Sequence, residues 1–172
     1  QPAKKRGDML TAKRLREVLR YDYLTGNFYW IIASSPRREA GMLAGSQHKT
    51  LGYIAIGIDG KKYFAHRLAW LYMTGKWPSK RLDHRDCNRS NNKWPNLRQA
   101  TGSQNISNAK LHKDSRSGFK GVTWSKYHRR WHANIRSNGV RYYLGHYATA
   151  IEAHTAYCEA THRLNGEFAR TS

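Results

Sequence analysis

The chain has 172 residues, of which 31 are Lys or Arg and 11 are Asp or Glu, giving a formal net charge of +20 at neutral pH. Hydrophobic residues make up 39% and aromatic residues 12%, which excludes a disordered basic tail, and no apolar run approaches the roughly 18 residues of a membrane span. A positive charge of this size indicates a polyanionic partner, most often a nucleic-acid backbone. Two cysteines, Cys87 and Cys158, are too few for a four-thiolate site, so we expect free thiols, a cytoplasmic location and no structural zinc.

The N-terminal part of the chain predicts a small unit of helices and strands behind a flexible basic leader at residues 1–7. Thr11 is a capping residue ahead of an amphipathic stretch, and Asp59-Gly60 is a two-residue turn between alternating segments. The predicted elements are a helix over 11–20, a strand over 27–32, a hairpin of strands 53–58 and 61–65, and a helix over 66–75.

The segment from 76 to 105 is polar and rich in asparagine, and it contains the sharpest functional signal. Asp83 and Asp86 are the only acidic residues between Gly60 and Lys113, and His84 lies between them. Two carboxylates beside an imidazole in a strongly basic segment indicate a metal site or a catalytic site.

Two asparagines follow this acidic pair at defined distances. Asn96 lies 12 residues after His84, and Asn105 lies 9 residues after Asn96. Thr101 and Gln104 form a capping box, so a helix is expected to begin at Thr101 and to carry Asn105 in its first turns. Taken singly, these residues are common in turns, and only their combined spacing indicates a ββα unit that brings the side chains to one point.

The order and spacing of AHRLAW, LDHRDCNRSNN, NL, T and QN resemble the HNH endonucleases of bacteriophages. The resemblance covers 66–108 and implies a ββα-metal fold within a domain spanning 8–108. It implies that His84 is the general base, that Asn96 orients His84, and that Asp83 and Asn105 bind one divalent ion, Mg²⁺ or Mn²⁺.

Cys87 departs from this family pattern, because the family often has Gly at this point of the loop. Gly adopts positive φ freely and Cys does not. The departure leaves the shape of the loop and the level of activity open.

The C-terminal third, after a polar linker at 109–118, predicts a second unit of three strands and a helix. The strands are expected over 119–126, 129–137 and 140–147, with Asn138-Gly139 as the turn between the last two. Thr149 and Glu152 form a capping box for a helix over 149–164. The whole chain is therefore expected to be α+β, with a ββα nuclease domain followed by a three-stranded antiparallel sheet packed on one helix.

The stretch from 119 to 172 resembles the Apetala/ethylene-response-factor DNA-binding domain through GFKGVTW, RWHANIR, RYYLGHYATAIEA and the residues that follow. That family places the exposed face of its sheet in the major groove. Strand alternation puts Ala133 and Ile135 on the helix side and Asn134 and Arg136 on the other side. The residues expected to contact DNA are Lys120, Trp124, Lys126, Arg129, Arg130, Asn134, Arg136, Arg141 and Tyr143.

Together these resemblances imply a metal-dependent endonuclease of the phage homing type that acts on double-stranded DNA as a monomer or a weak homodimer, without a membrane or a small-molecule cofactor. A monomer has one active site and is expected to nick one strand. A non-catalytic DNA-binding protein, such as a repressor or accessory factor built on a decayed HNH fold, is the alternative. RNA or ribosome binding explains the charge but not the spacing of Asp83, His84, Asn96 and Asn105.

Overall fold

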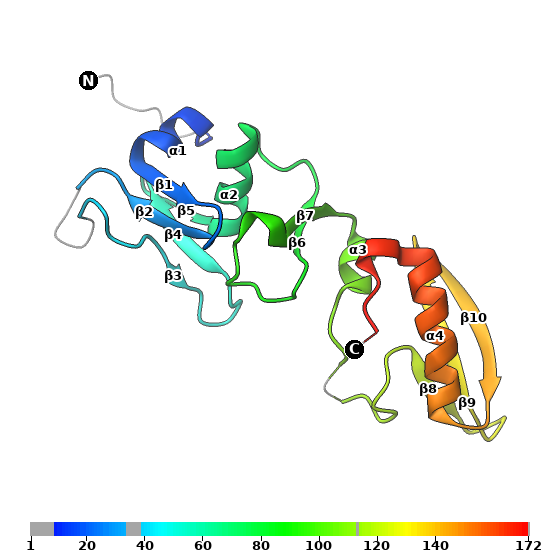
Figure 1. Ribbon diagram of the computed structural model, residues 1–172. Coiled ribbons are helices and arrows are strands. Elements are labelled where there is room, and N and C mark those ends of the chain that lie inside the picture. The colour runs from blue at the N-terminus through cyan, green and yellow to red at the C-terminus, as the bar shows by residue number, and fades with distance from the viewer. Residues whose placement is uncertain (1–8, 34–38, 113, 172) are drawn as a thin grey trace. The chain divides into compact units, whose positions relative to one another are not determined.

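The computed structural model describes residues 9–33, 39–112 and 114–171 (Figure 1). The leader predicted at residues 1–7 lies outside the described residues. The chain is α+β, as predicted, and divides into two compact units, Gln1–Gln99 and Ala100–Ser172. In the part of the chain that the structure describes, no helix has the length and apolar character needed to cross a membrane.

The first unit begins with a helix that is shorter than predicted. Helix α1 (Ala12–Val18) is capped by the hydroxyl of Thr11, which accepts a hydrogen bond from the Arg14 amide. The chain becomes extended at Leu19 and enters β1 (Leu19–Asp22), which pairs antiparallel with β2 (Asn27–Trp30). The helix predicted over 11–20 is wrong at its C-terminal end, because Leu19 and Tyr21 alternate into the core as strand residues.

The predicted hairpin and the helix that follows it are confirmed. Strands β4 (Ile54–Ile58) and β5 (Lys61–Phe64) pair around Asp59 and Gly60, which both have positive φ as a two-residue hairpin turn requires. The short strand β3 (Ser46–Gln47) pairs with β4. Helix α2 (Ala65–Thr74) follows β5 directly and ends at Gly75, which is left-handed.

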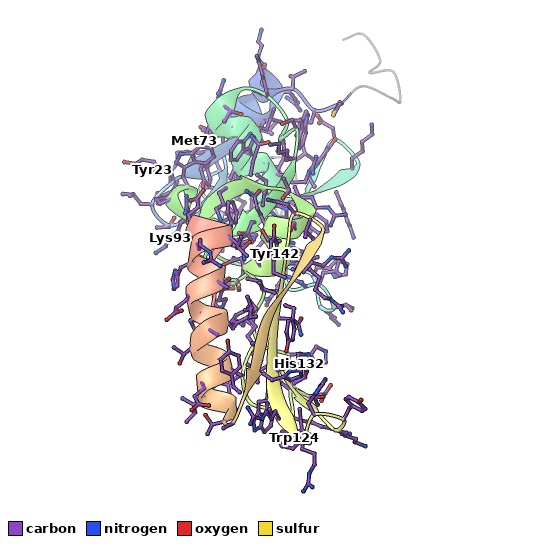
Figure 2. The ribbon with its side chains drawn as sticks, turned by 90° about the vertical axis from the view of Figure 1, so that its right-hand side faces the viewer. Tyr23, Met73, Lys93, Trp124, His132 and Tyr142 are labelled. Carbon is purple, nitrogen blue, oxygen red and sulfur yellow. The ribbon has the colours of Figure 1, made fainter. Side chains whose placement is uncertain are left out.

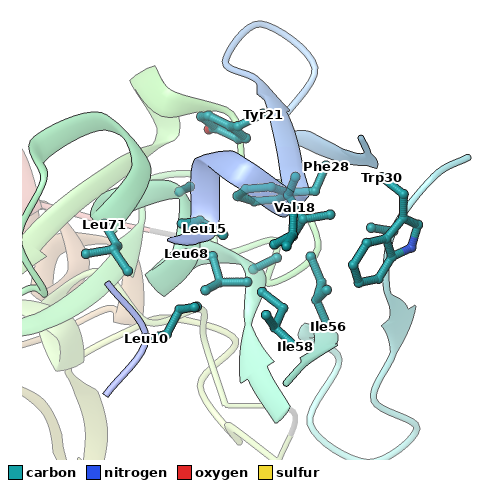
Figure 3. Close-up of a cluster of buried hydrophobic side chains, with 14 of the residues drawn as sticks. Leu10, Leu15, Val18, Tyr21, Phe28, Trp30, Ile56, Ile58, Leu68 and Leu71 are labelled. Atoms are coloured by element: carbon teal, nitrogen blue, oxygen red, sulfur yellow. The ribbon is translucent and has the colours of Figure 1, made fainter. Parts of the chain in front are cut away.

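One hydrophobic core holds these elements together (Figure 3). Leu15 of α1, Phe28 of β2, Ile56 of β4 and Leu68 of α2 are almost fully buried in it. Burial of a side chain of this size stabilises the fold by about 1.5–3 kcal/mol. The core therefore fixes β4, β5 and α2, which supply one wall of the candidate site.

A separate two-stranded sheet carries the acidic pair. It consists of β6 (Arg81–His84) and β7 (Leu97–Ala100), with the short 3₁₀ helix η1 (Trp94–Asn96) leading into β7. The predicted strand that ends at His84 is confirmed. Strand β7 was not predicted from the sequence, because Leu97, Arg98 and Ala100 are all buried and leave no clear alternation of polar and apolar residues.

The second unit begins with α3 (Gly102–Ser107), which starts with the predicted capping box of Thr101 and Gln104. It continues with the antiparallel sheet of β8 (Val122–Ser125), β9 (Arg130–Ser137) and β10 (Val140–Tyr147), in the order β10-β9-β8. Helix α4 (Ala150–Asn165) and the short 3₁₀ helix η2 (Gly166–Phe168) complete it. The three-stranded sheet packed on one helix is as predicted.

The contact between α4 and the sheet depends on small residues. Ala153 of α4 packs against Val122 and Ala133 of the sheet, in a cluster almost free of solvent. A Cβ atom added to Gly121 would lie 2.1 Å from the Tyr157 ring, so only glycine fits there, and its φ of +73° also requires glycine. Strand β8 begins directly after this turn, at Val122, and not at residue 119 as predicted.

Candidate active site

Asp83 and His84 end strand β6, and both side chains are buried. Strand alternation places neighbouring side chains on opposite faces, so these two residues meet different partners. Asp83 pairs with Arg98 of β7, and His84 meets Asn92 in the loop between the strands.

The imidazole of His84 is oriented by Asn92, which sequence reasoning did not identify. His84 Nε2 lies 3.3 Å from Asn92 Oδ1, and the Asn92 amide nitrogen donates to the carbonyl of Ser90 at 3.1 Å. Because the amide nitrogen is committed to Ser90, the oxygen faces His84 and Nε2 is the protonated ring nitrogen. Nδ1 is therefore the ring nitrogen that can accept a proton.

The β1–β2 hairpin holds Asn92 in place. Asn92 is only 2% exposed, and its carbonyl accepts a 2.6 Å hydrogen bond from the hydroxyl of Tyr21. A Cβ atom added to Gly26 would lie 2.4 Å from the backbone of Asn92 and Lys93, so the turn between β1 and β2 packs directly on this loop. The hairpin thus contributes to the site although none of its residues has a catalytic side chain there.

His84 is neutral at ordinary pH. Burial lowers its pKa, and the hydrogen bond with Asn92 and the charges of Asp86 and Asp83 offset this only in part. A buried, neutral and oriented imidazole is the form that a general base needs.

An aromatic wall covers His84 and is formed by Tyr53, which directly precedes β4, Phe64 of β5 and His66 of α2. Its ring lies 5.2 Å from the ring of His66 and 5.9 Å from that of Tyr53, and Phe64 stacks on His66 at 5.7 Å. Burial lowers the pKa of His66 to about 3, and the nearby His84 and Arg67 contribute to this shift. His66 Nδ1 is buried without a hydrogen-bond partner, which agrees with a ring that stays neutral.

Asn96 has a different set of partners from those expected. Its amide nitrogen donates to Asp86 Oδ1 at 3.0 Å and to the Asn91 carbonyl at 2.8 Å, and its oxygen accepts from the Asp86 amide at 3.1 Å. The His84 ring is hydrogen-bonded through Nε2 to Asn92 Oδ1. Asn96 closes the loop between β6 and β7, and its role in orienting His84 remains a prediction.

Asp86 is the partner of Asn96 in closing the loop between β6 and β7. Burial raises its pKa, but hydrogen bonds from Asn88, Asn91 and Asn96 outweigh burial and hold the pKa below its ordinary value. Cys87 follows with a φ of +60°, the strained conformation that the comparison with glycine anticipated. The Cys87 amide donates to the His84 carbonyl at 2.9 Å and so takes part in the turn that follows β6.

Asp83 forms a buried ion pair with Arg98, a residue that no feature of the sequence had marked as its partner. Arg98 Nε donates to Asp83 Oδ2 at 2.9 Å, and the two side chains are 7% and 6% exposed. The pair fixes the orientation of the carboxylate. It also supplies the compensating charge without which a buried carboxylate is costly.

Asn105 lies on α3, which belongs to the second unit by its contacts, whereas the sequence placed it in a domain over 8–108. It is half-buried there. Its convergence with Asp83 remains a prediction. Within residues 9–33, 39–112 and 114–171 there is no group of three or more His, Cys, Asp or Glu side chains arranged to hold a metal ion.

The sheet of the second unit has one face directed away from α4. Strand alternation and the register place on this face the residues Arg130, Asn134, Arg136, Arg141 and Tyr143, all of which were expected to contact DNA. The residues of β9 on the opposite face, Ala133 and Ile135, are buried, as predicted. Lys126 and Arg129 are exposed in the turn between β8 and β9.

Lys120 and Trp124, two further residues expected to contact DNA, also have partners within their own unit. The Lys120 ammonium donates to the carbonyls of Ser107, Ala109 and Arg170 at 2.7, 2.6 and 3.1 Å, so it links segments within its own unit. Trp124 pairs with Trp131 and by alternation shares the helix side of the sheet with Val122, although it is half exposed at the sheet end. Trp124 therefore does not share the outward face with the arginines, and DNA contact by Lys120 and Trp124 remains a prediction.

Comparison with known proteins agrees with the site in the first unit. The family model described as HNH endonuclease matches residues 63–106, which include the aromatic wall residue His66, the acidic pair and Asn105. These residues are an HNH endonuclease domain.

Protein 3.8 of Escherichia phage T7 is 33% identical to this chain over 90 residues, which make up 52% of this chain and 73% of that protein. The chain therefore belongs to the phage family that includes Protein 3.8. The solved structure titled "DNA binding and cleavage by the HNH homing endonuclease I-HmuI" is 22% identical, with a TM-score of 0.41 over 83% of this chain and 76% of that one.

Proposed function

We propose that the protein is a metal-dependent DNA endonuclease of the phage homing type that hydrolyses a phosphodiester bond and leaves 5′-phosphate and 3′-hydroxyl ends. The observation that carries this proposal is the buried, neutral His84, oriented by Asn92 at the end of β6 inside an HNH endonuclease domain. Family membership supports nuclease chemistry, and the geometry supports His84 as its general base.

In this proposal, His84 Nδ1 takes a proton from the attacking water while Nε2 stays hydrogen-bonded to Asn92. The imidazolium that forms is stabilised by the nearby charges of Asp86 and Asp83, which raise the pKa of His84. The wall of Tyr53 and His66 keeps the ring in place during this step.

Asp83 and Asn105 would hold one divalent ion. The residues fit such an ion, because Asp83 offers a carboxylate fixed by Arg98, and hydrogen-bonded carboxylate and amide oxygens are ligands that Mg²⁺ and Mn²⁺ accept. When bound, the ion would supply charge stabilisation at the phosphate and at the leaving 3′-oxygen. Convergence of Asn105 with Asp83 is part of the proposal.

The second unit would dock on double-stranded DNA in the manner of an Apetala/ethylene-response-factor domain. Its sheet presents Arg130, Arg136 and Arg141 on the face away from α4, and no acidic residue occurs between Ser115 and Ile151. Arginines on an exposed sheet suit guanine edges and phosphates. Lys126 and Arg129 extend this positive surface at the turn between β8 and β9.

A plasmid-nicking assay tests the proposal. Supercoiled DNA is incubated with the full chain in Mg²⁺, in Mn²⁺ and in EDTA, beside His84→Ala and the control His48→Ala, which changes an exposed histidine. We expect the wild type and His48→Ala to nick in the presence of metal, and EDTA or His84→Ala to abolish nicking while DNA binding persists. Cleavage that survives both EDTA and His84→Ala would contradict the proposal.

A non-catalytic DNA-binding protein is the second candidate. The observations that favour it are the buried Asp83–Arg98 pair, which engages the proposed metal ligand, and the strained Cys87 in the catalytic loop. If the wild type binds DNA but cleaves no substrate in either metal, this candidate replaces the first.

A further inference from the structure

The outward face of the second unit's sheet carries three histidines in addition to its arginines. Thr123 of β8 lies opposite His132 of β9, and His132 lies opposite His146 of β10, so the three residues form one rung across the sheet. Figure 2 shows His132 at the sheet, with α4 along the other side. No spacing in the sequence joined these histidines, because the register brings them together.

The imidazoles are close enough to interact. The ring of His146 lies 4.1 Å from that of His128, in the turn after β8, and 6.0 Å from that of His132. Tyr143 Oη is hydrogen-bonded to His146 Nδ1 at 2.5 Å. We call His128, His132 and His146 the histidine row.

The histidine row lies in a positive field. The charged groups on its side of the sheet are Lys126, Arg129, Arg130, Arg136 and Arg141, and the intervening sequence has no carboxylate. The acidic residues of α4, Glu152 and Glu159, belong to the helix that packs on the opposite face. Loss of hydration first, and then the neighbours His128, His132 and Arg130, lower the pKa of His146. In the free protein, His146 therefore resists protonation.

We infer that the histidine row is a proton-linked phosphate-binding site: it takes up protons when DNA binds, so that affinity for DNA increases as the pH falls. This inference rests on the proposed docking of the sheet on DNA. A phosphate within about 4–6 Å of an imidazole favours the charged form and typically changes its pKa by 1–3 units. Each proton taken up adds a charged contact to the backbone and strengthens the counterion-release contribution to binding.

The hydrogen bonds of His132 show what protonation must change. Asn134 Nδ2 donates to His132 Nε2 at 3.0 Å, and Thr123 Oγ1 lies 2.9 Å from the same nitrogen. Nε2 is an acceptor in this arrangement, so its protonation requires the Asn134 amide to turn its oxygen toward the ring. Asn134 is itself an expected DNA contact, and the two events are coupled.

A metal-binding role does not compete with this inference. Among the described residues, no group of three His, Cys, Asp or Glu side chains is arranged to hold a metal ion. A phosphate ligand agrees with the outward direction of the row and with the positive charge around it.

The test is fluorescence anisotropy of a labelled mixed-sequence DNA duplex with the full chain, in EDTA so that no cleavage occurs, from about pH 8 to about pH 6, the range in which histidine titrates. We expect the wild type to bind about threefold more tightly at the lower pH, because a phosphate-induced pKa rise of about one unit gives at most tenfold and reaches that limit only well below both pKa values. The variant His128→Gln/His132→Gln/His146→Gln should lose this gain in affinity between the higher and the lower pH. His162→Gln, at an exposed position on α4, is the matched control and should keep the full gain.

The outcomes separate this inference from the proposed function. Tight binding by the wild type with no change over the pH range would overturn the histidine row and leave DNA docking intact. A triple variant that keeps the wild-type gain would do the same. Absence of binding at every pH would overturn the docking role of the sheet and the row with it. If the triple variant does not fold, His146→Gln alone provides the test, with a reduced gain expected.

Discussion

Replacement of Asn92 by alanine is the most informative single change in the first unit. The substitution removes the partner of His84 Nε2 at 3.3 Å and the side-chain bond to Ser90 at 3.1 Å, in a position that is 2% exposed. Each buried hydrogen bond contributes about 0.5–1.5 kcal/mol, so the free energy of unfolding should fall by about 1–3 kcal/mol.

The catalytic effect should exceed what this loss of stability explains. Without Asn92 the His84 ring is free to change tautomer and orientation, and loss of such an orienting group typically lowers activity about 10- to 100-fold. We expect Asn92→Ala to reduce the rate of plasmid nicking by this factor at a temperature where the variant is folded, with DNA affinity unchanged.

Asn91→Ala is the matched control, because Asn91 is the adjacent asparagine and bonds Asp86 instead of His84. It should lower stability without a comparable loss of nicking. A wild-type nicking rate in Asn92→Ala, or an equal loss in both folded variants, would refute the assignment of Asn92 as the residue that orients His84.

Three further predictions concern the stability and ligand set of the site. Cys87→Gly relieves the strain of a φ of +60° and should raise the free energy of unfolding by about 0.5–1 kcal/mol in denaturant melts. Cys87→Ala should give no such gain. Equal stability of the two variants would argue against backbone strain at this position. His66 has a pKa of about 3 in the folded state and 6.5 in the unfolded state, so its contribution to stability is complete above pH 6.5 and is lost as the pH falls. Between pH 6.5 and about pH 4.5, the free energy of unfolding of the wild type should fall by about 2–3 kcal/mol more than that of His66→Phe. Equal losses in the two proteins would contradict this prediction. Arg98→Met leaves the Asp83 carboxylate buried without its partner and should lower the free energy of unfolding by about 3–5 kcal/mol. The double variant Asp83→Asn/Arg98→Met should recover most of this loss. A thermal melt in which the double variant is no more stable than Arg98→Met would contradict the contribution of the ion pair.

The elements that follow local rules were predictable from the sequence. The Asp59-Gly60 and Asn138-Gly139 turns and the capping boxes of Thr101 and Thr149 all form as expected, because each depends on residues close together in the chain. The alternation in β9 likewise predicted which residues face α4. Local chemistry therefore gave the α+β class and most element positions.

The partners of the site depend on contacts between distant residues, and these were not predictable. Asn92 is one of four asparagines between residues 88 and 96, and only the packing of Tyr21 and Gly26 against it distinguishes it from its neighbours. Arg98 lies in a strand without clear alternation, so nothing marked it as the partner of Asp83.

The partners of Lys120 were likewise not predictable from the sequence. Its position matched a DNA contact by resemblance, but its flexible side chain reaches three carbonyl groups of its own unit. A lysine in a basic sequence has many anionic and carbonyl partners within reach, and the sequence alone does not select among them.

The central claim is that the imidazole of His84 itself takes the proton during hydrolysis. Chemical rescue tests this claim most directly: His84→Gly is assayed for nicking of supercoiled DNA in Mg²⁺ with increasing concentrations of free imidazole. The account predicts no nicking by this variant alone and recovery of nicking that rises with imidazole concentration and with its neutral fraction. A His84→Gly variant that nicks at the wild-type rate without imidazole would contradict the account.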